Sequence, residues 1–271
     1  MISIITVNLN GVEGLRKTME SVFAQKCRDY EYILIDGGST DGSRDLIREN
    51  DTKITYWVSE PDKGIYAAMN KGIRAARGEY CLFLNSGDWL FDEEVVGYLK
   101  ENTLTGSEVY YSFLPKNGTK DEFDTYPKEL DLKFFVTGCI NHQNSVIRRD
   151  YLYKFGLYNE KFRIMSDWHF ALKAKYRDKI RFKYLDRPIA YYLGDGISAD
   201  PKLSSLRAQE RRKMLEDVFG DLGPTMIDYY FGYKESIYYD ILQLGGGNKL
   251  FTFCLKAYRH LLRRIAASRH P

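Results

Sequence analysis

The stretch from Ser59 to Leu90, SEPDKGIYAAMNKGIRAARGEYCLFLNSGDWL, most constrains the fold of this chain. Apolar and small residues recur at helical spacing between residues 65 and 76, which predicts a helix that packs closely on a sheet. The apolar run YCLFL at residues 80–84 is typical of a strand buried on both faces. It ends at NSGD, residues 85–88. Polar residues at such a strand end lie where open α/β sheets bind ligands, although an isolated NSGD is also typical of a turn that only ends the strand.

The same order of strand, polar turn and helix occurs earlier in the chain. Residues 2–7 predict a strand that ends at Asn8, residues 32–35 one that ends at Asp36, and residues 54–58 one that leads to Glu60 and Asp62. Strands that alternate with helices at short spacing predict a parallel sheet with right-handed crossovers. The strand ends then meet at one edge of the sheet, and their carboxylates and amides form one pocket. Oxygen ligands of this kind favour Mg²⁺ or Mn²⁺ over zinc.

The composition excludes several classes of protein. A net charge of +3 is too small to indicate a nucleic-acid partner. Neither GxGxxG nor GxxxxGK[ST] occurs, so a dinucleotide-binding fold and a P-loop are not supported. The four cysteines are far apart and form no CxxC pair, which favours a reducing cytosol and excludes a zinc knuckle. The 22 tyrosines indicate either a surface that stacks on a base or sugar, or a tyrosine-rich core.

The chain has no sequence signature of a membrane span or a secretory signal. No apolar run approaches the ~20 residues that cross a bilayer, and the N-terminus enters a strand pattern directly. We therefore expect a cytoplasmic protein, either soluble or bound peripherally at the inner face of the cytoplasmic membrane. The length of 271 residues allows one large domain, or one domain with an extension.

Four ordered motifs carry a resemblance to a known family: SIITVNLNG, IDGGSTDGS, SEPDKGIYAAMNKGI and LFLNSGDWL. Together they resemble the inverting family 2 glycosyltransferases of the GT-A fold, especially bacterial members that build surface polysaccharides. The resemblance implies an α/β fold over residues 1–200, in which a Rossmann-like, mainly parallel sheet is flanked by helices, and a C-terminal helical extension over residues 201–271. It also implies transfer of a sugar, with inversion, from a nucleotide-sugar donor, which we expect to be a UDP-sugar, to a saccharide or lipid-linked saccharide acceptor.

The resemblance assigns donor-binding roles to residues at the strand ends. It implies contacts to the base and ribose from the first two strand ends, contacts to the nucleotide and donor sugar from the EPD loop and the fourth strand end, and a contact to the diphosphate from a later Gly-Ile-Ser turn. These residues are Thr6, Asn8, Asp36, Glu60, Asp62, Lys63, Asn85 and Ser198.

The acidic motif of the family departs from its usual form in this chain. The family motif usually reads Asp, any residue, Asp, whereas Asn85, Ser86, Gly87 and Asp88 stand here. Asp88 is therefore the candidate ligand for a divalent cation, Mn²⁺ or Mg²⁺. Ala67 is a second departure, because similar sequences often have an aspartate there.

Inverting transfer needs a base that deprotonates the acceptor hydroxyl as it attacks the anomeric carbon. Ser166-Asp167-Trp168 resembles the family segment in which an aspartate at a helix start is that base, which implies Asp167; the alternative is that Asp167 only caps the helix. The resemblance also places His142 and Gln143 near the donor sugar or acceptor, although a lone histidine is often structural. Trp168 is expected either to line the acceptor pocket or to pack in the core.

The C-terminal part of the chain differs in character. Residues 202–219 predict a polar helix with a solvated face. After three glycines, residues 249–269 combine an apolar stripe with basic residues and contain no acid. This pattern is typical of a helix on an anionic membrane surface, and equally of a helix that packs on the catalytic domain or on another subunit, so an oligomer stays open.

Two other functions compete with glycosyl transfer. A sugar-1-phosphate nucleotidyltransferase has a similar sheet but needs a loop rich in glycine and lysine after its first strand, and TVNLNGVEG lacks that lysine. A catalytically silent nucleotide-sugar binding module is favoured by the small number of acidic residues in the acidic motif and by Ala67. It is opposed by the presence of Asp36, Asp62, Asp88 and Asp167.

Overall fold

The computed structural model describes residues 1–103, 106–115, 123–124, 126–193, 196 and 200–223. Its centre is a seven-stranded sheet with the strand order β10-β6-β9-β4-β1-β2-β3. These strands are β1 (Ile2–Asn8), β2 (Tyr30–Asp36), β3 (Tyr56–Ser59), β4 (Tyr80–Phe83), β6 (Val109–Ser112), β9 (Ser145–Arg148) and β10 (Phe182–Leu185). The pairs β1 with β2, β1 with β4, β2 with β3 and β6 with β10 are parallel, and β9 runs antiparallel to both β4 and β6.

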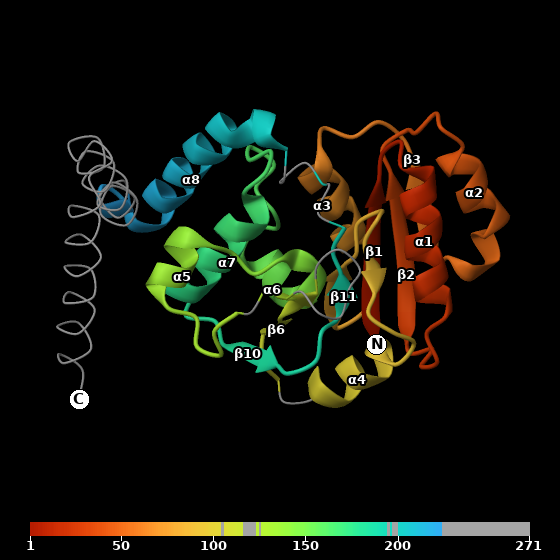
Figure 1. Ribbon diagram of the computed structural model, residues 1–271, viewed down its shortest axis with the longest axis horizontal. Helices are drawn as coiled ribbons and strands as arrows, with labels where there is room; N and C mark the ends of the chain where they lie inside the picture. The colour runs from red at the N-terminus through yellow and green to blue at the C-terminus, as the bar shows by residue number, and fades with distance from the viewer. Residues whose placement is uncertain (104–105, 116–122, 125, 194–195, 197–199, 224–271) are drawn as a thin grey trace, which may run out of the picture.

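The predicted α/β fold with a mainly parallel sheet is confirmed. Helices cover both faces of the sheet (Figure 1). One apolar cluster joins the sheet to α1, α2 and α4, and a second joins its other face to α3, α6 and α7. The helices are α1 (Val12–Phe23), α2 (Ser43–Glu49), α3 (Ile65–Ala75), α4 (Val95–Asn102), α5 (Leu132–Thr137), α6 (Arg149–Lys154), α7 (Ser166–Tyr176) and α8 (Ser204–Phe219).

Among the residues described, four short strands form two further sheets of two strands each. β5 (Trp89–Leu90) pairs antiparallel with β11 (Ala190–Tyr191), and β7 (Leu114–Pro115) pairs with β8 (Phe123–Asp124). The 3₁₀ turn η3 (His142–Asn144) immediately precedes β9. Trp89 of β5 lies opposite Tyr191 of β11, and their rings stack with centroids 5.1 Å apart. This pairing fixes the loop after β4, which carries the acidic motif.

The helix α8 packs into the fold instead of facing solvent all round. Met214 and Leu215 are fully buried in a third apolar cluster, which they share with residues of α5 and α7. Glu210, on the same helix, is only 5% exposed. The predicted solvated face is present, since Arg212, Lys213 and Glu216 are exposed, but the opposite side of the helix is buried. The sequence pattern did not show this buried side because charged residues are interspersed with the apolar ones.

None of the helices in the described part of the chain has the length and apolar character needed to span a membrane. The basic segment 249–269 and Ser198 lie outside the described residues. The predicted boundary near residue 200 stays a prediction.

Gly72 allows α3 to lie directly on the sheet. A Cβ at this position would overlap the Cγ2 methyl of Ile5 in β1, and it would also meet Ile35 of β2. Gly97 in α4 is different, because a Cβ there would make an ordinary contact 3.7 Å from Cys27. We expect Gly72→Ala to lower the free energy of unfolding by about 1–3 kcal/mol through overpacking. Urea unfolding monitored by circular dichroism measures this change.

Gly97→Ala is the matched control. It should raise the free energy of unfolding by about 0.4–1 kcal/mol, because alanine restricts the unfolded chain and fits the helix. Equal effects of the two substitutions would contradict the close packing of α3 on β1.

Candidate functional site

The ends of β1, β2 and β3 lie side by side at one edge of the sheet. The register pairs Asn8 with Asp36, and Asp36 with Ser59. Asn8 Nδ2 donates to Asp36 Oδ1 at 2.8 Å, and Ser59 Oγ donates to Oδ2 at 2.6 Å. Ser39 adds two bonds, from its backbone N–H at 3.0 Å and from its hydroxyl at 2.5 Å. The Asp36 carboxylate is thus held by four donors from three segments.

These donors keep Asp36 ionised. Burial alone would raise the pKa of Asp36, but the hydrogen bonds from Ser39, Ser59 and Asn8 outweigh it and hold the pKa below its usual range. The Asn8 amide oxygen is buried, and no hydrogen-bond partner for it lies within the described residues. Asp36 is fully buried and its carboxylate is occupied by these donors, so it orients Asn8, whose amide oxygen is the acceptor left for a hydroxyl or N–H group at this edge.

Thr6 lies away from this edge. Its side chain is fully buried, and its hydroxyl accepts a hydrogen bond from Tyr32 at 3.0 Å. The expected contact between Thr6 and a nucleotide does not fit this position, because Thr6 lies two residues before the strand end and points into the core. Thr6 and Asn8 point to the same face of the sheet, but Thr6 lies two residues further from the strand end, beneath the packed side chains.

The EPD loop is fastened to α3 by one lysine. Lys71 Nζ lies 2.6 Å from Glu60 Oε1 and 2.5 Å from Asp62 Oδ1. The Asp62 side chain is mostly buried, whereas Lys63 is exposed. Lys71 therefore holds two of the predicted donor contacts in place beside the end of β3.

A second group of polar side chains surrounds Asp167 at the first turn of α7. His142 Nδ1 lies 3.0 Å from Asp167 Oδ2, and the Tyr66 hydroxyl lies 2.9 Å from Oδ1. The backbone N–H of Trp168 also donates to Oδ1 at 2.9 Å. The Asp167 side chain remains 21% exposed. It is thus held in one orientation and still reachable by a ligand.

His142 connects this carboxylate to the end of β4. Asn85 Nδ2 lies 2.9 Å from His142 Nε2. With the amide nitrogen facing the ring, Nε2 accepts a hydrogen bond, and Nδ1–H donates to Asp167. The His142 ring therefore joins Asn85, which is predicted to contact the nucleotide sugar, to Asp167, the candidate base.

The turn that carries Asp88 is fixed on α1. The Thr18 hydroxyl donates to the Asp88 carbonyl at 2.6 Å and accepts from the Gly87 N–H at 3.0 Å. Gly87 has a φ of +100°, which strongly favours glycine. A Cβ on Gly14 of α1 would come within 3.0 Å of the Gly87 backbone. Glycine stands where the family motif suggests an acid because the turn needs this backbone conformation.

The described residues suit a divalent cation that arrives with its substrate. Asp88 is 5% exposed and supplies one carboxylate at this turn. Within the described part of the chain, no group of three or more His, Cys, Asp or Glu residues could hold a metal ion alone. One carboxylate with substrate phosphates and waters is an ordinary Mg²⁺ arrangement. The protein ligands available here therefore fit a divalent cation that is bound jointly by Asp88 and by a substrate diphosphate.

Trp168 and Gln143, which are predicted to contact the acceptor or donor sugar, are buried in the protein. Trp168 is 8% exposed, its indole N–H donates to the Phe135 carbonyl at 2.7 Å, and Arg211 lies over its ring. This position supports the core alternative for Trp168. Gln143 is also buried.

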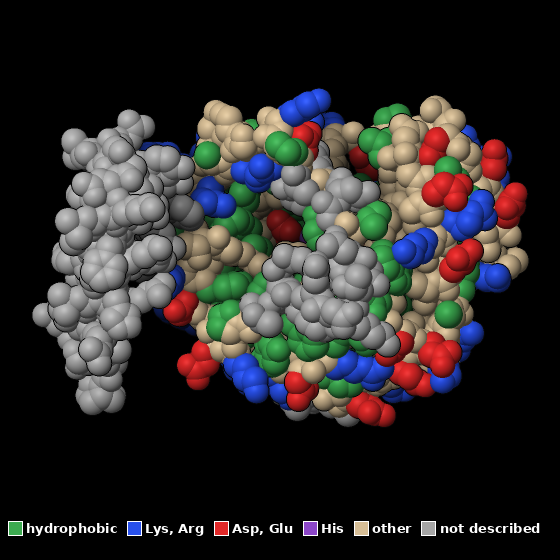
Figure 2. Space-filling model, in the orientation of Figure 1, with side chains coloured by type: hydrophobic (Ala, Val, Ile, Leu, Met, Phe, Trp, Pro, Cys, Tyr) green, Lys and Arg blue, Asp and Glu red, His purple; other side chains and the backbone are tan. Residues whose placement is uncertain are grey.

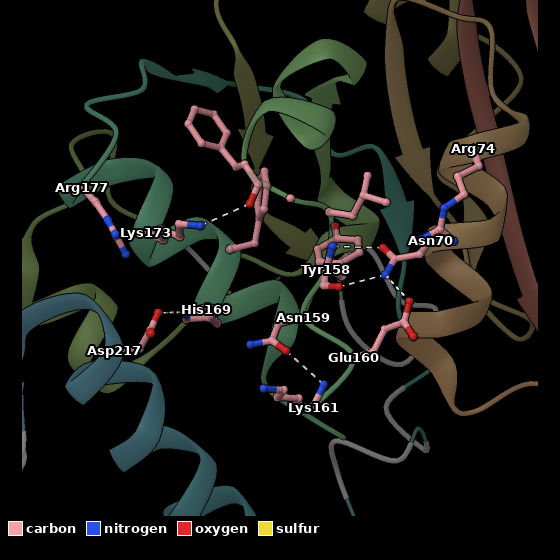
Figure 3. Close-up of a pocket in the computed structure, with 14 residues that line it drawn as sticks. Asn70, Arg74, Tyr158, Asn159, Glu160, Lys161, His169, Lys173, Arg177 and Asp217 are labelled. Atoms are coloured by element: carbon pink, nitrogen blue, oxygen red, sulfur yellow. Dashed lines mark hydrogen bonds and ion pairs between the residues drawn. The ribbon is translucent and has the colours of Figure 1, made fainter.

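Figure 2 shows a hollow near the middle of one face, with an acidic side chain at its bottom. A separate cavity of about 630 Å³ lies between α3, α7 and α8. In Figure 3, Asn70 of α3 bonds to Tyr158 and Glu160, and His169 of α7 faces Asp217 of α8. None of the predicted site residues lines this cavity.

Comparison with known proteins identifies the family. The sequence pattern of glycosyl transferase family 2 matches residues 3–156. The chain belongs to glycosyl transferase family 2. This assignment confirms the resemblance, shows that the protein is a glycosyltransferase and favours that function over the nucleotidyltransferase alternative.

Relatives and solved structures agree with the family. An uncharacterized glycosyltransferase of Mycobacterium tuberculosis is 35% identical over 180 residues, which are 64% of this chain and 68% of that protein. A PGL/p-HBAD biosynthesis glycosyltransferase of Mycobacterium bovis is 29% identical over 71% of this chain and 76% of its own.

Two solved structures are similar to this chain in fold. S. aureus TarS has a TM-score of 0.65 and 18% identity over 84% of this chain, and the match spans only 42% of TarS. The mannosyltransferase PcManGT of Pyrobaculum calidifontis has a TM-score of 0.66 and 13% identity over 96% of this chain and 79% of its own. At these identities the likeness concerns the fold alone.

The hydrogen bonds to Asp36 predict a measurable titration shift. Since the folded-state pKa is depressed, Asp36 stabilises the fold above its unfolded pKa, and this contribution is lost as the pH falls through the folded pKa. Ser59→Ala removes one donor to a charged group, worth about 1.5–3 kcal/mol, and should raise the pKa of Asp36 by about one unit or more. Carboxyl ¹³C NMR titration measures the shift.

Ser43→Ala provides the control. Ser43 donates to Asp41 at 2.6 Å, and this bond lowers the pKa of Asp41. The control should move the titration of Asp41 and leave that of Asp36 unchanged. An unmoved Asp36 resonance in Ser59→Ala would show that the bond is not formed in solution.

Proposed function

We propose that this glycosyltransferase transfers a sugar, with inversion, from a UDP-sugar to a saccharide or lipid-linked saccharide in the synthesis of a bacterial cell-surface polysaccharide. The observation that carries the proposal is the Asp167 carboxylate, which Tyr66 and His142 hold in one orientation while it stays reachable. His142 also contacts Asn85 at the end of β4, the strand next to β1 in the sheet.

The donor is proposed to bind at the ends of β1, β2 and β3. Asp36, whose carboxylate already accepts four hydrogen bonds, would orient Asn8, and the unpartnered amide oxygen of Asn8 would accept from an N–H or hydroxyl of the nucleoside. TarS residues 1–349 have been solved with UDP-GlcNAc, and PcManGT with GDP-Man and Mn²⁺. These complexes support a nucleotide-sugar donor; the choice of uridine remains part of the proposal.

The proposed reaction is a single displacement. The acceptor oxygen forms a bond to the anomeric carbon while the bond from that carbon to the diphosphate oxygen breaks, and UDP leaves with the electron pair. The acceptor proton passes to Asp167. Attack from the face opposite UDP inverts the anomeric configuration.

The hydrogen bonds indicate which oxygen of Asp167 acts as the base. Oδ1 already accepts from the Tyr66 hydroxyl and from the Trp168 N–H. Oδ2 accepts from His142 alone among the bonds of the described residues. Since each carboxylate oxygen has about two lone-pair positions, Oδ2 retains one for the acceptor hydroxyl.

A divalent cation, Mn²⁺ or Mg²⁺, is proposed to bind with the donor diphosphate, and Asp88 would be its ligand from the chain. When bound, it would neutralise charge on the departing diphosphate. Thr18 and Gly87 hold the Asp88 turn against α1, so the position of this ligand is fixed by the fold.

The two aspartates should separate binding from transfer. Asp167→Asn keeps the side-chain shape but cannot take up the proton, so we expect UDP to bind as in wild type while the turnover rate falls by about 10²–10⁴-fold. Asp88→Ala should instead weaken UDP binding in the presence of Mn²⁺ and have little effect in its absence. Isothermal titration calorimetry with UDP measures binding. UDP release from UDP-Glc, UDP-Gal or UDP-GlcNAc, with a bacterial lipid extract as acceptor, measures transfer.

Asp150→Asn is a suitable control, because Asp150 of α6 pairs with Arg148 at the end of β9 and takes no part in the site. It should leave both measurements unchanged. Full transfer by Asp167→Asn would end its assignment as the base, and an absence of transfer by the wild type with every donor would favour the silent binding module.

The acceptor class and location are proposed from the sequence of the C-terminal segment. Residues 249–269 combine an apolar stripe with basic residues, a pattern that suits an anionic membrane surface and a lipid-linked acceptor. Removal of residues 249–271 should abolish flotation with vesicles that contain phosphatidylglycerol and leave UDP binding intact. Vesicles of phosphatidylcholine alone are the control. Unchanged flotation of the truncated protein would exclude this membrane role.

A further inference from the structure

We propose that Glu210 of α8 is a positioning residue for Asp167, acting through the Ile164–Met165 peptide and Tyr66. The inference deepens the proposed function, because it assumes that Asp167 takes up the acceptor proton. It concerns a helix beyond the region that matches the family, which ends at residue 156.

The Glu210 carboxylate binds three successive backbone N–H groups just before α7. Oε1 accepts from Arg163 N at 2.6 Å, and Oε2 accepts from Ile164 N at 2.9 Å and from Met165 N at 3.1 Å. Glu210 is only 5% exposed, so water competes little for these bonds. Hydrogen bonds to an ionised acceptor are about twice as strong as neutral ones. Glu210 thus fixes the turn from which α7 and Asp167 begin.

The peptide group between Ile164 and Met165 is bonded on both sides. Its N–H donates to Glu210, and its carbonyl oxygen accepts from the Tyr66 hydroxyl at 2.6 Å. A peptide whose N–H donates to a carboxylate is polarised, which strengthens its carbonyl as an acceptor. The charge of Glu210 therefore acts on the bond that Tyr66 makes to Ile164.

The Tyr66 hydroxyl has one proton and two acceptors within reach. Ile164 O lies at 2.6 Å and Asp167 Oδ1 at 2.9 Å. When Tyr66 donates to Asp167, it stabilises the ionised carboxylate. When Tyr66 donates to Ile164, its oxygen can accept a hydrogen bond from protonated Asp167. A strong acceptor at Ile164 thus lets the Tyr66 oxygen accept from Asp167 once rotation of the protonated carboxyl group brings its O–H toward Tyr66.

This coupling distinguishes Glu210 from a carboxylate that only caps a turn. A cap stabilises the fold, and its loss lowers the melting temperature without a specific effect on the chemical step. A positioning residue changes turnover more than donor binding, and its effect depends on Tyr66. Both readouts are open to measurement in the full-length protein.

The experiment uses Glu210→Gln, Tyr66→Phe and the double variant. Glu216→Gln is the matched control, because Glu216 is an exposed carboxylate on the same helix. We expect Glu210→Gln to lower kcat by about 10–100-fold and to change the Kd of UDP by less than about 2-fold. The loss in the double variant should be at least about 5-fold smaller than the product of the two single losses, because both substitutions break one chain of bonds. Wild-type kcat in Glu210→Gln, or losses that multiply, would overturn the proposal.

A second readout does not depend on activity. The ring nitrogens of His142 report its contact with Asp167, and ¹⁵N-detected NMR of histidine-labelled protein resolves them. We expect the His142 Nδ1 resonance to move in Glu210→Gln and to stay fixed in Glu216→Gln. An unmoved resonance in folded Glu210→Gln would also overturn the proposal. If Glu210→Gln does not fold, replacement of Met165 by its α-hydroxy analogue removes the linking N–H and also weakens the Ile164 carbonyl as an acceptor for Tyr66. Both changes loosen the same link, so the same outcomes apply.

The Asp167→Asn variant separates failure of this inference from failure of the proposed function. If Asp167→Asn is fully active, the base assignment is wrong, and the NMR result alone decides whether Glu210 positions Asp167. If Asp167→Asn is inactive and Glu210→Gln transfers as the wild type does, the inference fails and the proposed function stands.

Discussion

The contacts of Asp167 join parts of the chain that lie far apart in sequence. Tyr66 comes from α3, His142 from the turn before β9, and Asp167 from α7. A carboxylate in this partly buried position needs donors around it, because an unpaired charge away from water is costly. The hydrogen bonds of this one side chain therefore join α3 and α7 to the turn before β9, in addition to the apolar cluster that the two helices share.

The edge of the sheet at which we propose that the donor binds depends on a different constraint, the parallel alignment of β1, β2 and β3. Parallel register brings Asn8, Asp36 and Ser59 into adjacent positions, and the hydrogen bonds to Asp36 follow from that alignment. His142 links the two parts through Asn85. A substrate with a nucleotide at one end and a reacting sugar at the other suits a site of this composition.

Much of the fold could be predicted from the sequence because its signals are local. Apolar runs and helical periodicity gave the positions of β1, β2, β4 and α3 to within a few residues, and the polar strand ends predicted where Asn8 and Asp36 lie. The rest depends on contacts that leave no local pattern. Tyr66 and Asp167 are about a hundred positions apart, and Glu210 lies in a helix whose charges suggested a solvated surface. The antiparallel β9 and the burial of Thr6 likewise follow from tertiary packing.

The departures from the family motif become intelligible from these contacts. Gly87 is required by a backbone conformation with a φ of +100°. Asn85 faces His142 Nε2, on the opposite side of the ring from Asp167. An aspartate at position 85 would place the ring between two carboxylates and would remove the amide N–H that faces Nε2. Asparagine supplies that N–H, so the ring is held with Nδ1 directed at Asp167. The amide at position 85 thus has a structural role in the contacts of Asp167.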